Sequence, residues 1–162
     1  NAGEPFSGGR ESLRLEITIL TDSCGGCPYC EFPYDAQVPV KTDKGYESRT
    51  FNNVDDVWDV IGLVIEETKD MNEKTGRGFD LVKSMIAQIP FFTCPNHIRD
   101  NKYLKLINQY LYCVETGTPA YPGSYGEQPA RWIEHFFIIK NAIAKKQQSM
   151  QEEAKREAKN AK

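Results

Sequence analysis

The sequence predicts an α+β fold, in which a small amino-terminal antiparallel β part is followed by four helices. Apolar residues alternate with polar ones early in the chain, and a turn signal then separates two short strand-like runs. From residue 54 onward the apolar residues recur at helical spacing. With 162 residues, 40% of them hydrophobic, the chain is long enough to build its own core. We expect a single domain over residues 1–144 and a charged helical or frayed tail over residues 145–162.

The β part is expected to contain one strand and one hairpin. Every second residue from Leu13 to Ile19 is apolar, which is typical of a strand buried on one face, so we expect a strand over residues 13–21. A hairpin is expected over residues 38–51, because Asp, Lys and Gly at positions 43–45 favour a turn between its two strands.

Four helices are expected to follow the hairpin. The first begins behind Asn53, a favoured N-cap, and the second ends at Pro90, because proline has no amide to continue the helix. The third is expected over residues 101–115. Pro129 opens the last helix, whose apolar band ends near Ala144 while strong helix formers continue beyond it. We therefore expect the last helix to be long and to project from the body.

The charge distribution argues against nucleic acid as a partner. The chain carries a net charge of -3, and its last 18 residues hold six basic and three acidic side chains. The body is therefore about -6, whereas binding to nucleic acid needs clustered positive charge. No apolar run approaches the ~20 residues of a membrane-spanning helix, and we expect no membrane span. The polar first residues also lack the apolar core of a signal peptide.

The strongest chemical signal lies in the cysteines. Cys24, Cys27 and Cys30 follow one another at two x2 spacings on a loop that contains two glycines, which brings three thiolates together. A fourth ligand must come from elsewhere in the chain. The stretch "CPNH" supplies two candidates, Cys94 and His97. We therefore expect these five residues to include the ligands of a metal site.

Two kinds of metal group fit these candidates. Cysteines at x2 spacings together with Cys94 and the proline after it resemble the ligand pattern of [4Fe–4S] ferredoxin-type sites. Cys27 and Cys30 with Cys94 and His97 would equally form a zinc site of Cys3His type. We favour the [4Fe–4S] cluster over zinc, because it uses more of the thiols; free thiols or a disulfide without metal are the third interpretation. Either metal would be a structural staple between the β part and the helical part.

Enzymatic readings find little support. "CPYC" at residues 27–30 is identical to the glutaredoxin active-site tetrapeptide, but Pro33 and Pro39 leave no room for the helix that the first cysteine of that motif must cap. Cys113 is interpreted as a small apolar residue of a helix and not as a ligand. No constellation of nucleophile and base is visible, so we expect neither an enzyme nor a small-molecule substrate.

A resemblance covers residues 94–144, about a third of the chain. A Tyr-rich helix, a "G-x-P-x-Y-P-G" loop and a "Q-P" pair opening an aromatic helix resemble the pattern of small structural and assembly proteins of tailed bacteriophages. The cysteine loop at residues 24–30 is not part of that pattern, but some phage tail-tip hub proteins are similar in carrying a cysteine-bound iron–sulfur cluster. The matching residues are Gly117, Pro119, Tyr121, Pro122, Gly123, Gln128, Pro129 and Trp132.

The resemblance implies a structural component of a phage virion, in the tail tip or baseplate hub, assembled in the host cytoplasm. Its partners would be other subunits of a protein assembly, docked on an aromatic surface. The residues expected to bind them are Tyr121, Tyr125, Trp132, Phe136 and Phe137. The alternative function is an intracellular metal or redox module built on the same cysteines.

Overall fold

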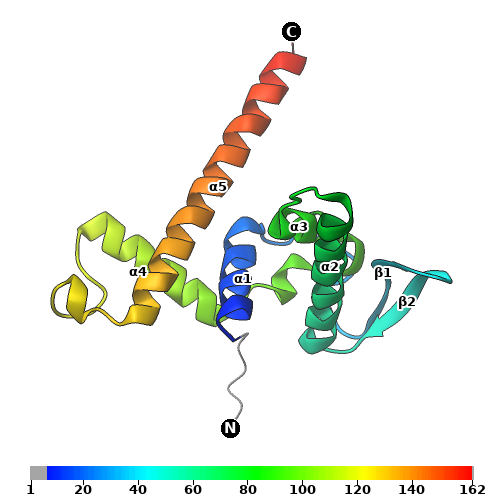
Figure 1. The fold of residues 1–162 in the computed structure, drawn as a ribbon, viewed down its shortest axis with the longest axis horizontal. Coiled ribbons are helices and arrows are strands. Elements are labelled where there is room, and N and C mark those ends of the chain that lie inside the picture. Colours follow the sequence, from blue (N-terminus) through cyan, green and yellow to red (C-terminus); the bar gives the residue numbers. More distant parts are fainter. Residues whose placement is uncertain (1–6, 162) are drawn as a thin grey trace. The chain divides into compact units, whose positions relative to one another are not determined.

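The computed structural model describes residues 7–161 and has the expected α+β content (Figure 1). Five α-helices, two strands and two 3-10 helices occur in this part of the chain. Their order is α1 (Ser7–Leu20), β1 (Tyr34–Thr42), β2 (Gly45–Phe51), α2 (Val54–Thr75), α3 (Leu81–Phe92), η1 (Pro95–His97), α4 (Asn101–Thr116), η2 (Tyr125–Glu127) and α5 (Ala130–Asn160).

The elements group into two compact units. The hairpin unit comprises Thr21–Arg99 and contains β1, β2, α2, α3 and η1. The helical unit joins the described part of residues 1–20 to that of residues 100–162 and contains α1, α4, η2 and α5. That residues 1–144 fold as one domain stays a prediction. Within residues 7–161 no helix combines the length and the apolar character that crossing a membrane requires.

The hairpin is confirmed, with an earlier start than expected. β1 and β2 pair antiparallel from Thr42 opposite Gly45 to Tyr34 opposite Phe51. The pairing is irregular between residues 37 and 41, around Pro39, where proline has no amide to donate to the neighbouring strand. The turn ends at Gly45, whose φ of 99° is a conformation that favours glycine. The two strands form the whole sheet within the described residues.

Two helices cover the hairpin and close the core of this unit. α2 and α3 pack against each other and against β1. α2 begins where the Asn53 side chain accepts a hydrogen bond from the amide of Asp56, 3.1 Å away. α3 does not end at Pro90 as predicted but continues to Phe92. Pro90 lies in the last turn, where a missing amide costs one hydrogen bond, and the fully buried Phe92 ring holds that turn against the core.

The strand predicted over residues 13–21 is wrong, because this segment is the helix α1. Leu15 and Ile19 lie four residues apart on one helix face and both are buried. Ile17 and Thr18 are buried as well, so the second half of α1 is enclosed around most of its circumference. Alternation of apolar residues therefore does not distinguish strand from helix here, and packing against neighbouring helices decides the conformation.

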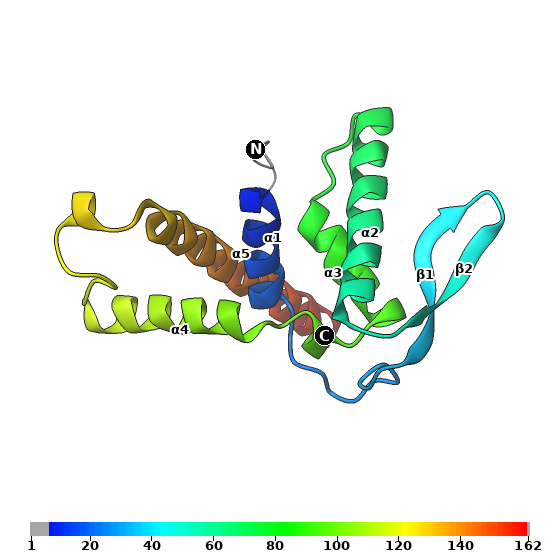
Figure 2. The ribbon, with the colours of Figure 1, turned by 90° about the horizontal axis from the view of Figure 1, so that it is seen from below.

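The helical unit has a core of its own. α1 packs against α5 and α4, and Figure 2 shows α4 and α5 joined by a long loop that carries η2. α4 matches the helix expected over residues 101–115 and ends at Gly117, with φ of 68°. α5 is long, as predicted, and its residues 147–160 are exposed, so that its end projects from the rest of this unit. The buried residues of this core are Leu15, Ile19, Tyr103, Tyr110, Trp132, Ile139 and Ala142.

Candidate metal centre

Four cysteine side chains converge in the hairpin unit. The sulfur atoms of Cys24, Cys27, Cys30 and Cys94 all lie within 4.8 Å of one another. The Cys30 Sγ is central: it lies 3.7 Å from that of Cys24, 3.6 Å from that of Cys27 and 3.9 Å from that of Cys94. The expected convergence of the loop with the segment 64 residues further on is therefore found.

The loop wraps its own sulfur atoms with backbone groups. Gly26, with φ of 102°, turns the chain so that its amide donates a hydrogen bond to the Cys24 Sγ, 3.3 Å away. The Cys30 thiol contacts the Cys27 carbonyl oxygen at 3.2 Å. A residue with a side chain at position 26 would be strained, which explains the use of glycine between the first two cysteines.

The fourth cysteine stands at the start of η1. Cys94 is 1% exposed and precedes Pro95, which opens the short helix. The side chain of Asn96 accepts a hydrogen bond from the amide of Cys24, 3.2 Å away. Cys30 is exposed, and Cys24 and Cys27 are half-buried. The group thus has one cysteine in the core and three toward the surface.

His97 is not a member of the sulfur group. Its Nε2 lies 2.8 Å from the backbone oxygen of Tyr29, within hydrogen-bonding distance, and its ring stacks on that of Phe32 with the ring centres 4.2 Å apart. Among the described His, Cys, Asp and Glu side chains, only the four cysteines form a group close enough to hold one metal ion. The structure therefore groups Cys24, and not His97, with the other three cysteines of the expected zinc site. His97 instead contacts the backbone of the cysteine loop.

Aromatic side chains tie the cysteine loop to the body of the hairpin unit. The Tyr29 hydroxyl donates to the backbone oxygen of Phe91 at 3.4 Å. The Tyr34 hydroxyl donates to the Thr93 hydroxyl at 3.1 Å, and its ring stacks on that of Phe51. These contacts connect residues on both sides of Cys30 to the segment just before Cys94, so the positions of the cysteines are held by side chains outside the sulfur group.

The surroundings of the cysteines shift the pKa values of their thiols in opposite directions. The hydrogen bond from the Gly26 amide lowers the pKa of Cys24 from its ordinary 9.0 to about 7. Burial raises the pKa of Cys94 to about 12 and also raises that of Cys27. Residues 27–30 form a turn instead of a helix start, so no helix dipole acts on Cys27 as the glutaredoxin motif requires.

The aromatic residues expected to bind partners lie in the helical unit and divide into two kinds. Trp132 is 7% exposed and packs edge-on against Tyr121 and Phe136. Tyr125 and Phe137 are 74% and 49% exposed. Tyr121 is 40% exposed, so Tyr125 and Phe137 are the two residues of this set that offer a neighbour the largest fraction of their surface. Partner binding by these residues stays a prediction.

An apolar groove of about 280 Å³ lies beside these exposed aromatic residues. Cys113 is half-buried in its wall, in agreement with its expected role as a small apolar residue. The loop between α4 and α5 and the first turns of α5 supply the other walls, among them Ala120, Tyr125, Ile133 and Phe137.

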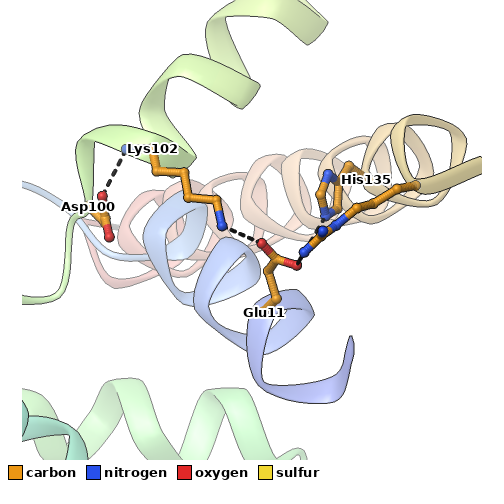
Figure 3. A network of polar contacts seen from close by, with 5 residues as sticks. Glu11, Asp100, Lys102 and His135 are labelled. Atoms are coloured by element: carbon orange, nitrogen blue, oxygen red, sulfur yellow. Dashed lines mark hydrogen bonds and ion pairs between the residues drawn. The ribbon is translucent and has the colours of Figure 1, made fainter. Parts of the chain in front are cut away.

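A polar network in the helical unit was not foreseen from the sequence. Figure 3 shows Glu11 of α1 reaching toward Lys102 of α4 and His135 of α5. Lys102 and Arg131 stand 91 and 120 residues from Glu11, so no local spacing signals these ion pairs. The prediction of a strand over residues 13–21 also gave no reason to place Glu11 on a helix.

The chain matches no protein-family model, no curated protein and no solved structure in the three comparisons. The fold and the site therefore define it only as an α+β chain with a four-cysteine group that could bind a metal ion.

Proposed function

We propose that Cys24, Cys27, Cys30 and Cys94 bind one zinc ion, which stabilises the hairpin unit of a structural subunit. The separation of the sulfur atoms carries this proposal. A tetrahedral zinc ion with Zn–S bonds of about 2.3 Å places its four sulfur atoms about 3.8 Å apart. The observed separations from Cys30 are 3.6, 3.7 and 3.9 Å, which agree with that arrangement.

The distances between the sulfur atoms favour zinc, although the positions of the cysteines in the sequence favour a [4Fe–4S] cluster. In such a cluster each cysteine binds a different iron atom, and the four sulfur ligands surround the whole cluster. They must then stand farther apart than ligands that share one ion. All four sulfur atoms here lie within 4.8 Å of one another, so a cluster would require the loop to open.

The coordination supports a structural instead of a catalytic role. Four cysteine ligands fill the tetrahedron around zinc, whereas catalytic zinc sites keep one position open for water or substrate. The residues that hold the ligands are aromatic side chains and backbone groups, as in the contacts of Tyr29 and His97. We therefore propose a non-enzymatic protein without a small-molecule substrate.

The assembly that we propose is a phage virion, with the chain in the tail tip or baseplate hub. The resemblance of residues 94–144 to tail structural proteins supports it, and so does the exposed apolar surface of the helical unit. Tyr125 and Phe137 are exposed next to an apolar groove, which is typical of a surface that a neighbour covers. Assembly would take place in the host cytoplasm.

Two measurements on the full chain test the two parts separately. Elemental analysis of the purified protein is expected to give one zinc per chain and a colourless protein. Cys94→Ser is expected to lose its zinc to a chelator that leaves the wild type loaded. Cys113→Ser is the matched control and is expected to keep its zinc. A brown protein containing iron would contradict the zinc assignment. For the assembly, mass spectrometry of purified phage particles is expected to find the chain in tails, and its absence from them would contradict the virion role.

A further inference from the structure

A second groove of the helical unit is positively charged, although the chain as a whole is negatively charged. It has a volume of about 560 Å³ and is lined by residues from α1, α4 and α5 and from the loop before α5. Three of its side chains, Lys102, Lys105 and Arg131, are cationic, and one, Glu11, is anionic. The groove therefore has a formal charge of +2, whereas the chain as a whole has -3.

Both carboxylate oxygens of Glu11 already accept hydrogen bonds from neighbouring cations. Its Oε1 accepts from the Lys102 ammonium at 2.6 Å, its Oε2 accepts from the Arg131 guanidinium, and the His135 Nε2 lies 3.9 Å from Oε2 (Figure 3). The Glu11 side chain is only 13% exposed. The hydrogen bond from Lys102, followed by that from Arg131, lowers the pKa of Glu11 from 4.5 to about 2, so the carboxylate keeps its charge.

The cations, by contrast, still face water. The side chains of Lys102 and Arg131 are 60% and 69% exposed, and Lys105 is exposed as well. An ammonium has three N–H donors and a guanidinium has five, so each cation keeps donors after its bond to Glu11. Asp100 is the nearby acid in Figure 3, and it accepts from the backbone amide of Lys102 at 2.8 Å as a helix cap. Glu11 thus holds two exposed cations in the lining of the groove.

The other part of the groove is apolar. Leu106, Tyr121, Pro129 and Trp132 line it together with the cations. A ligand that fills this space needs oxyanions and apolar groups side by side. A phosphate group or a nucleic-acid backbone has no apolar side chains and would leave the apolar wall uncovered. A peptide with acidic and apolar side chains meets both requirements.

We propose that this groove binds an acidic peptide segment of a neighbouring protein, with its carboxylates on Lys105 and Arg131 and its apolar side chains on Tyr121 and Pro129. The inference deepens the proposed role in an assembly, and it is independent of the metal site. Electrostatic complementarity of this kind gives specificity and a salt-sensitive association.

The test uses the full zinc-loaded chain and a defined probe. The probe is an eight-residue peptide, acetylated and amidated at its ends, in which Asp-Glu pairs alternate with Tyr-Leu pairs. Binding is measured by titration calorimetry. It is also followed by the fluorescence of Trp132 in a Trp58→Phe variant, which leaves one tryptophan, in the groove wall. We expect binding below about 100 μM at low salt and at least tenfold weaker binding of the Asn-Gln version of the peptide.

A charge reversal identifies the site. Lys105→Glu is expected to weaken peptide binding at least tenfold without disturbing the ion pairs of Glu11. Lys140→Glu is the matched control, because Lys140 is an exposed lysine of α5 outside the groove, and it is expected to change binding less than twofold.

Four results would overturn the proposal: no peptide binding at 1 mM, equal binding of the neutral peptide, equal effects of the two lysine variants, or inorganic phosphate binding as tightly as the peptide. Zinc content is measured on the same samples. A chain with one zinc that fails to bind the peptide would therefore reject the groove and leave the metal assignment intact.

Discussion

Replacing Glu11 by glutamine removes a carboxylate that joins α1 to α4 and α5 through two cations. The change keeps the size of the side chain and removes its charge. The ion pairs with Lys102 and Arg131 are then lost, while the core residues around Leu15 stay in place. We expect the helical unit to lose stability at neutral pH without changing its fold.

The size of the loss follows from the pKa of Glu11 and from the exposure of its partners. A fall from 4.5 to about 2, at about 1.4 kcal/mol for each tenfold change, sets a ceiling of roughly 3 kcal/mol. Lys102 and Arg131 are more than half exposed, so solvent screens both pairs, and we expect about 1 kcal/mol.

The sign of the pH dependence is fixed by the direction of that change. Because the folded pKa of Glu11 lies below its unfolded value, the stabilisation is fully present above about pH 5 and is lost as the pH falls toward 2. The difference between wild type and Glu11→Gln is therefore expected to be largest at pH 7 and less than half as large at pH 3.

The assay is urea unfolding followed by Trp132 fluorescence in the Trp58→Phe background, which reports on the helical unit. Glu115→Gln is the control, because Glu115 is an exposed glutamate of α4 in the same unit, and we expect a loss below about 0.5 kcal/mol there. An unchanged unfolding free energy for Glu11→Gln at pH 7, or the same difference at pH 3 and pH 7, would refute the reasoning.

Three further predictions concern the cysteine group and α5. Cys94→Ser is expected to weaken zinc binding at least a hundredfold, measured by competition with a chelator. It is also expected to destabilise the hairpin unit by about 3 kcal/mol or more, measured by thermal unfolding. An unchanged zinc affinity would exclude Cys94 as a ligand. His97→Ala is expected to keep one zinc per chain. It is expected to lower the free energy of unfolding by about 1–2 kcal/mol, because the hydrogen bond to Tyr29 and the stacking on Phe32 are lost. Loss of the metal in elemental analysis would show that His97 is a ligand. Deletion of residues 147–162 is expected to change the unfolding free energy by less than about 0.5 kcal/mol, because residues 147–161 are exposed, and a larger loss in urea titration would contradict that.

The residues of the cysteine group could be predicted from the sequence more completely than the fold around them. Cys24, Cys27 and Cys30 are close in sequence, so their spacing alone requires one loop to hold all three. Cys94 could be proposed as the fourth ligand because few cysteines were left. The role of His97 could not be read from "CPNH", because it depends on a backbone oxygen 68 residues away. Spacing also favoured a cluster, and only the distances between sulfur atoms support a single ion.

The failure at α1 has a different cause. The run from Leu13 to Ile19 satisfies both a strand pattern and, at Leu15 and Ile19, a helical one. Which applies depends on the surfaces that meet it, and these come from α4 and α5, far along the chain. By contrast, α2 could be predicted from its own residues, because Asn53 caps it and its apolar residues lie on one face.

X-ray absorption at the zinc edge of the purified full chain tests the central claim most directly. The account predicts four sulfur neighbours at about 2.3 Å around each zinc and no second metal atom nearby. A nitrogen neighbour in place of one sulfur, or an iron edge with iron–iron scattering, would contradict it.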